Sequence, residues 1–218
     1  MASSFLKGKV DVTKTAVIGY SMGGYGALIT AGASLTQHFI ESTDPRWSSP
    51  FGTLAHEPKF DPRVKTAIVF APAGWSKGVF DAESIKSIKV PMLFAAGSLD
   101  DVVGYDDGVR PTWAAATSID RTLITFENGG HNSAPLIPAP EEADKIDPEL
   151  GFNLLAHYVD AVWDPVRLDN VAEHFVTAWL GKYLKGDQAM DAYLDGSWKG
   201  FPDHTVRGLR LERLQAGK

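Results

Sequence analysis

The chain has 218 residues, 44% of them hydrophobic and 22% charged, which is typical of a globular protein with one sizeable core. Its formal net charge of −6 argues against nucleic acid as a partner, and its lack of cysteine excludes disulfides and thiolate metal sites. The N-terminal residues 1–10 contain no long apolar segment, so we expect neither a signal peptide nor a membrane span or membrane partner, and we expect a cytoplasmic location. One domain, residues 1–218, is expected, with residues 140–218 as a helical C-terminal extension packed on it.

The first predicted elements are a strand at residues 14–19 and a helix of small residues that begins near Gly24. They are joined by the sequence Gly-Tyr-Ser-Met-Gly at residues 19–23. Glycines two positions before and after a serine let strand and helix approach closely, while the turn exposes the serine on strained backbone. Ser21 is therefore the candidate nucleophile. The backbone N–H of Met22, at the N-terminus of the helix, is a candidate donor to an oxyanion.

A second match to the same pattern, Gly-Trp-Ser-Lys-Gly, occupies residues 74–78. Pro72 separates it from the preceding apolar run, and no helix of small residues follows, so we interpret Ser76 as a loop serine. Trp75 lies just after the predicted strand at 65–70, where it is a candidate for substrate contact, with simple surface packing as the alternative. Tyr20 is a second candidate for substrate contact because it adjoins the nucleophile.

Two further predicted strands end in polar residues that a serine nucleophile needs. Asp100 follows the strand at 91–96, and His131 follows the strand at 121–126. The carboxyl ends of parallel strands meet at one edge of a sheet, so these side chains should lie near Ser21. A base that takes the serine proton and a carboxylate that orients the base complete a catalytic triad. The order Ser, Asp, His is that of α/β-hydrolases.

Two alternatives remain open for the acidic residues near the third strand. Asp101 could take the role of Asp100, because the two are adjacent. The group could also hold a divalent ion, but its spacing matches no known metal-binding loop, and we expect no metal and no cofactor. The group consists of Asp100, Asp101, Asp106, Asp107 and His131.

The remaining segments carry less information about function. Residues 34–63 read as an irregular excursion between the first helix and the second strand, placed where it could cover a site. From Leu168 to Gly186, apolar residues recur at spacings of three and four, which predicts an amphipathic helix that ends at the glycine.

Several stretches resemble the dienelactone-hydrolase-like branch of the α/β-hydrolase superfamily, and the likeness runs from about Val12 to the C-terminus. They are Gly-Tyr-Ser-Met-Gly-Gly-Tyr-Gly-Ala-Leu (19–28), Ala-Gly-Ser-Leu-Asp-Asp-Val-Val-Gly-Tyr (96–105), Gly-Gly-His-Asn (129–132), Trp-Lys-Gly-Phe (198–201) and Gly-Leu-Arg-Leu-Glu (208–212). The resemblance implies a parallel sheet with flanking helices and a hydrolase of esters or lactones. The matching positions are Ser21, Asp100 and His131. Dienelactone hydrolases proper use a cysteine nucleophile, so the serine here shifts the expectation to a carboxylic ester hydrolase acting on a small-molecule ester.

The predicted nucleophile strand comes unusually early. Only 20 residues precede Ser21, whereas α/β-hydrolases usually place several strands before the nucleophile. The chain is therefore expected to form the C-terminal part of that fold, from the nucleophile strand onward. The rival hypothesis is a truncated, weakly active or inactive chain that acts as a subunit or self-associates. An unpaired first strand would pair with a second copy, be covered by residues 34–63 or leave the chain poorly stable, and we favour self-association as a homo-oligomer.

Overall fold

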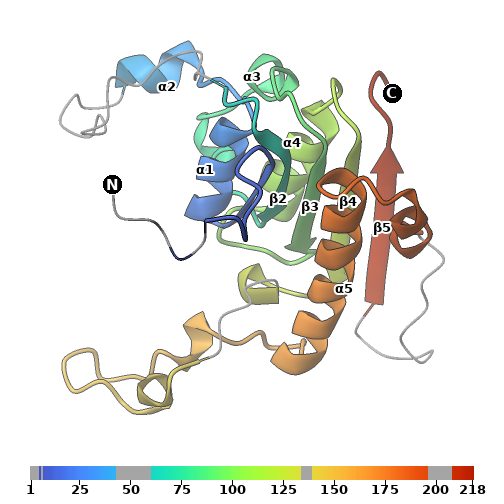
Figure 1. The fold of residues 1–218 in the computed structure, drawn as a ribbon. Helices are drawn as coiled ribbons and strands as arrows, with labels where there is room; N and C mark the ends of the chain where they lie inside the picture. Colours follow the sequence, from blue (N-terminus) through green and yellow to red (C-terminus); the bar gives the residue numbers. More distant parts are fainter. Residues whose placement is uncertain (1–4, 6, 43–59, 134–138, 196–207) are drawn as a thin grey trace.

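The computed structural model describes residues 5, 7–42, 60–133, 139–195 and 208–218 (Figure 1). Five strands form one sheet, in which the first four strands run parallel and the last is antiparallel to its neighbour. This arrangement, with helices packed against the sheet, belongs to the α/β class. The four strands predicted from the sequence are present with small shifts at their ends. The strands lie in the order β1 (Thr15–Tyr20), β2 (Val64–Phe70), β3 (Met92–Gly97), β4 (Arg121–Glu127) and β5 (Gly208–Leu214).

Helices cover both faces of the sheet (Figure 1). One face packs against α1, α3 and α4, and the other packs against the long helix α5. The α-helices are α1 (Met22–Thr30), α2 (Gln37–Ser42), α3 (Ala82–Lys86), α4 (Arg110–Ala115) and α5 (Pro165–Tyr183). Shorter helical turns are η2 (Trp75–Lys77), η3 (Tyr105–Val109), η4 (His131–Ser133), η5 (Glu141–Asp144), η6 (Leu155–His157) and η7 (Gln188–Leu194).

The central strands are apolar on both sides, which explains their continuous hydrophobic runs in the sequence. On β3, Phe94 packs into the core under α3 and α4, while Leu93 packs against α5 on the opposite face. The predicted amphipathic helix is α5, and Trp179 on its inner face is fully buried. This helix begins three residues earlier than predicted, because the Asp164 side chain caps it by accepting a bond from the N–H of Arg167.

The last strand, β5, was not predicted. Its leucines alternate with charged residues, and Leu209 and Leu211 pack against the core beside α5. On the polar side, Glu212 accepts two hydrogen bonds from Arg110 at 2.6 and 2.9 Å. The alternation of Leu with Arg and Glu in residues 209–212 is the signal of a half-buried strand. The segment from residue 140 onward is therefore not purely helical, since its end completes the sheet.

The first strand, β1, lies at one edge of the sheet. Among the described residues, no strand pairs with its outer side. The N–H of Ser21 donates to Phe70 of β2, so by alternation the N–H groups of Ala16, Ile18 and Tyr20 point away from the sheet. The Ile18 side chain is 48% exposed, so this edge is partly apolar.

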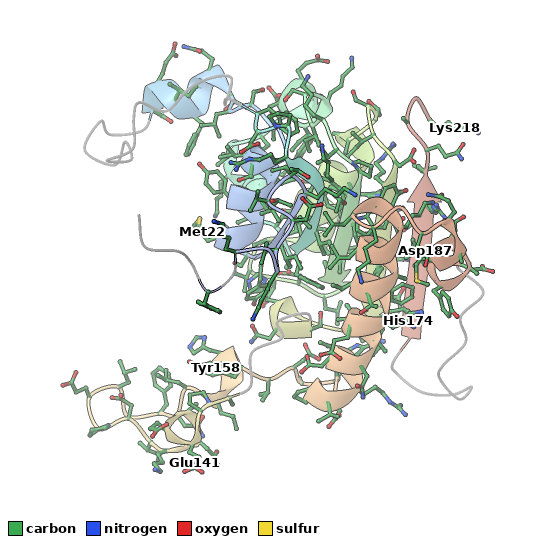
Figure 2. All side chains as sticks on the ribbon, viewed as in Figure 1. Met22, Glu141, Tyr158, His174, Asp187 and Lys218 are labelled. Carbon is green, nitrogen blue, oxygen red and sulfur yellow. The ribbon has the colours of Figure 1, made fainter. Side chains whose placement is uncertain are left out.

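One segment extends away from the sheet. Residues 139–158, which follow the His131 turn in the chain, form a projecting arm (Figure 1). In the view of Figure 2, Tyr158 lies between Glu141 of this arm and Met22 at the start of α1. The predicted excursion at 34–63 contains α2, and residues 43–59 of it lie outside the described residues. In the described parts of the chain, no helix has the length and apolar character needed to cross a membrane.

Candidate active site

Ser21 lies at the turn between β1 and α1, where the backbone is strained. Its φ of 52° and ψ of −113° place it outside the regions that residues with a side chain ordinarily occupy. Two hydrogen bonds hold this turn against the end of the neighbouring strand: the N–H of Ser21 donates to Phe70 at 2.9 Å, and its carbonyl accepts from Ala73 at 3.1 Å. The strain, typically about 1–3 kcal/mol, is thus offset by bonds to β2 and the residues after it.

The turn depends on two glycines, of which one was predicted and one was not. A Cβ on Gly19 would come within 2.1 Å of the carbonyl oxygen of Gly23, so a side chain there is excluded. A Cβ on Gly23 would meet nothing within 4 Å, so the prediction that Gly23 itself must lack bulk is wrong. The close contact is at Gly24, where a Cβ would lie 2.8 Å from the Cα of Pro72. The residue of α1 that packs closely against the segment after β2 is therefore Gly24, one position later than predicted.

These two adjacent glycines provide a matched test of the packing. We expect Gly24→Ala to lower the free energy of unfolding by about 1–3 kcal/mol, because the backbone of Pro72 cannot move aside easily. Gly23→Ala should be neutral or stabilising by up to about 1 kcal/mol, because alanine favours the helix and finds open space. Chemical denaturation of both variants measures the difference. Equal stability of the two variants would contradict the assignment of the contact to Gly24.

The three predicted triad residues are in hydrogen-bond contact. The distance from Ser21 Oγ to His131 Nε2 is 3.0 Å, and the distance from His131 Nδ1 to Asp100 Oδ2 is 2.9 Å. His131 begins η4, four residues beyond the end of β4, and Asp100 lies three residues beyond the end of β3. The strand ends therefore bring together residues that lie 110 and 31 positions apart in the chain.

The structure distinguishes Asp100 from Asp101. The carboxylate of Asp100 has no exposed side-chain surface, and its Oδ1 accepts bonds from the N–H groups of Val102 and Val103 at 3.0 and 3.1 Å. With His131 on Oδ2, both oxygens of the buried carboxylate have partners. Asp101 is exposed. Asp100 is therefore the residue placed to orient the imidazole.

Glycines also set the spacing of the two loops that carry Asp100 and His131. A Cβ on Gly97 would lie 2.1 Å from the carbonyl oxygen of Gly129, so the loops could not approach this closely with any larger residue at 97. The same carbonyl accepts a hydrogen bond from the N–H of Leu99 at 2.8 Å. The contact couples the position of Asp100 to that of His131. Gly97 was not predicted to be part of the site.

Met22 is predicted to donate its backbone N–H to an oxyanion, and this role stays a prediction. It is the first residue of α1, where backbone N–H groups have no partner within the helix and the positive end of the helix dipole lies. Its side chain is 71% exposed, and two residues beside Asp100, Leu99 and Val102, are each 62% exposed. The residues next to Ser21 and Asp100 thus present apolar side chains to solvent at the carboxyl edge of the sheet.

The second Gly-x-Ser-x-Gly segment lies in a different setting. Ser76 lies in η2, and its hydroxyl donates to the carbonyl of Val103 at 3.1 Å. The structure places it on a helical turn and not on a strand-to-helix turn. Trp75 is half-buried and packs against the core on the side of α1. Its role in substrate contact stays a prediction.

Tyr20 contacts the His131 loop. Its ring lies against the imidazole with the centroids 5.0 Å apart, and its hydroxyl donates to Asn132 Oδ1 at 2.9 Å. Burial and, secondarily, the negative charge of Asp100 raise the pKa of the Tyr20 hydroxyl to about 12, so it remains a donor through the neutral range. Tyr20 therefore contacts the imidazole and bonds to the residue after it, and its predicted contact with substrate stays a prediction.

A hollow of about 540 Å³ borders the loop that carries Asp100. Its walls come from η2 and from residues 98–107, and they include the carboxylates of Asp101, Asp106 and Asp107. Within the described ranges, no group of three or more His, Cys, Asp or Glu side chains is arranged to hold a metal ion.

Comparison of the chain with protein-family models gives no match, and comparison with curated protein sequences gives none either.

Proposed function

We propose that this protein is a serine hydrolase of the α/β-hydrolase superfamily that cleaves carboxylic esters through an acyl-enzyme intermediate. The observation that carries the proposal is the continuous hydrogen-bonded chain from Ser21 through His131 to the buried Asp100. The strained backbone at Ser21 and the position of Met22 at the N-terminus of α1 support it, because they match the demands of a nucleophile and an oxyanion donor. The resemblance to the dienelactone-hydrolase-like branch points to the same chemistry.

Each of these residues has a role in the proposed reaction. His131 Nε2 takes the proton from Ser21 Oγ while this oxygen forms a bond to the ester carbonyl carbon. The Met22 N–H stabilises the negative oxygen of the tetrahedral intermediate. His131 then protonates the leaving alcohol, and water, deprotonated by the same imidazole, releases the acid and restores Ser21. Asp100 holds His131 in the tautomer that presents an unprotonated Nε2 to the serine.

A panel of nitrophenyl esters with acyl chains of rising length tests this function. We expect hydrolysis that saturates with substrate and exceeds the rate in buffer alone. The exposed apolar residues beside the triad, Met22 and Leu99, favour esters with an apolar acyl group, and lactones are a further class to include. An absence of hydrolysis across the whole panel and the lactones would count against the proposal.

A second candidate is favoured by the open edge of β1. The outward N–H groups of Ala16, Ile18 and Tyr20 and the half-exposed Ile18 side chain form a surface that pairs readily with another strand. On this view the chain self-associates through β1, and it acts as a subunit with weak activity or none. Self-association alone is compatible with the first candidate, because Ser21 Oγ bonds to His131 and does not take part in strand pairing, whereas a lack of activity is not.

Self-association through β1 predicts a mass that depends on concentration. We expect light scattering across a micromolar dilution series to show a dimer that dissociates on dilution, and Ile18→Lys to remain a monomer because a charge on an edge strand opposes pairing. Val12→Lys is the matched control, since Val12 is 68% exposed but precedes β1, and it should behave like the unmodified chain. A stable monomer with full esterase activity at all concentrations would contradict the association.

A further inference from the structure

The loop that carries His131 is held between two distant parts of the chain. Tyr20, at the end of β1, contacts it on one side, through its ring and its hydroxyl. Residues 156–163, which we call the clamp segment, bond to it on the other side. The clamp segment runs from the end of the projecting arm to the start of α5. It is therefore separate in the chain from β3 and β4, the strands that Asp100 and His131 follow.

Asp160 makes the central contact of the clamp segment. Its Oδ1 accepts bonds from the N–H groups of Val162 and Trp163 at 2.9 and 2.8 Å, which fixes the turn before α5. Its Oδ2 accepts a bond from the N–H of Gly130 at 2.7 Å. Gly130 immediately precedes His131. One carboxylate therefore uses both oxygens to tie the clamp segment to the residue next to the proposed base.

Two further contacts fix the loop on either side of Gly130. Asn132 donates through Nδ2 to the carbonyls of Ala156 and Val159 at 2.7 and 3.3 Å. Trp163, which is only 1% exposed, donates through its indole nitrogen to the carbonyl of Glu127 at 3.0 Å. The clamp segment thus bonds to the last residue of β4, to the residue immediately before His131 and to the residue immediately after it. Trp163 also packs edge-on against Phe126 of β4, which anchors the clamp segment in the core.

We propose that Asp160 is a positioning residue: through the Gly130 N–H it holds the His131 imidazole where it can bond to Ser21 and Asp100 at once. The imidazole has to satisfy two distances of about 3 Å simultaneously, so a small shift of its backbone breaks one of them. Displacements of about 1 Å in a reacting group cost about a hundredfold in rate. The effect on rate rests on the proposed function, whereas the effect on the imidazole does not.

Asp160→Asn tests this role with the least change in shape. Asparagine has one acceptor oxygen, so it can serve the turn or the Gly130 N–H but not both. The matched control is Asp147→Asn in the projecting arm. Asp147 Oδ1 accepts from the N–H groups of Glu149 and Leu150 at 2.8 and 2.9 Å. Asp147 therefore forms the same kind of turn as Asp160, with bonds from the residues two and three positions later, but it has no bond to the His131 loop among the contacts given above.

In ester hydrolysis, we expect Asp160→Asn to lower kcat by about 10- to 100-fold with KM changed less than twofold, because the bound ester is held elsewhere. Asp147→Asn should change neither. Asp160→Asn could instead lower only the melting temperature, with a kcat equal to that of the unmodified protein at temperatures where the variant is folded. Asp160 would then be structural and the proposal would be wrong.

A second measurement does not require turnover. The proton on His131 Nδ1 that bonds to Asp100 should give a deshielded proton resonance, assigned by its loss in His131→Gln. We expect Asp160→Asn to shift or broaden this resonance and Asp147→Asn to leave it unchanged. A resonance that changes as expected in a protein without esterase activity would support the positioning role and refute the proposed function. An unchanged resonance in Asp160→Asn would overturn the positioning role, whatever the activity.

Discussion

Replacing Ser21 by alanine should reduce ester hydrolysis to near the background rate, a loss of about 10⁴-fold or more. The reason is that alanine removes the oxygen that would form the acyl-enzyme, while the strained turn and its bonds to Phe70 and Ala73 involve only backbone atoms. The fold should survive, and circular dichroism would check it. Initial rates with the best ester of the nitrophenyl panel measure the loss.

Ser76→Ala is the matched control, because Ser76 lies in the other Gly-x-Ser-x-Gly segment. Its hydroxyl bonds to the Val103 carbonyl and not to an imidazole, so we expect the activity of the unmodified protein with a small loss of stability. If Ser76→Ala were the inactive variant and Ser21→Ala retained its rate, the assignment of the nucleophile would be wrong.

Replacing Asp100 by asparagine should lower kcat by about 10⁴-fold with little change in KM. The amide can accept the bonds from Val102 and Val103 through its oxygen, but it then presents an NH₂ group to His131. That group favours the tautomer with a proton on Nε2, which cannot take a proton from Ser21. Steady-state kinetics of the variant measure the effect, with denaturation to confirm that the fold is kept.

Asp101→Asn controls for the loss of a charge at the neighbouring position. Asp101 is exposed and lies on the wall of the adjacent hollow, so we expect kcat within about twofold of the unmodified protein. A larger loss in Asp101→Asn than in Asp100→Asn would mean that the two aspartates exchange roles in solution.

The residues of the triad could be predicted from the sequence because each follows a strong local signal. Ser21 lies between an apolar strand and a helix of small residues, and Asp100 and His131 each come soon after a continuous apolar run. Buried parallel strands produce such runs, and their shared direction brings the ends together. Three local patterns therefore predict one shared site at this edge of the sheet. In the structure, Ser21 and Asp100 both lie within hydrogen-bond distance of His131.

Other features could not be predicted, because they depend on contacts without a local signal. Gly23 and Gly24 are adjacent in the sequence, and only the packing of α1 against Pro72 shows which one needs to lack a side chain. Asp160 lies 30 residues from Gly130, and nothing near it in the sequence distinguishes it from Asp147, which forms the same turn. The strand β5 is different, because leucine alternates with charged residues at 209–212, but residues 140–218 were interpreted as a helical extension and this signal was overlooked.

The central claim, that Ser21 is an activated nucleophile, is tested most directly by reaction with a fluorophosphonate. Such a reagent forms a stable bond only with a serine whose proton a neighbouring base removes. Intact-mass measurement followed by peptide mapping should find one phosphonyl group per chain, on Ser21, and none in His131→Gln. An unmodified chain, or a phosphonyl group on Ser76, would contradict the claim.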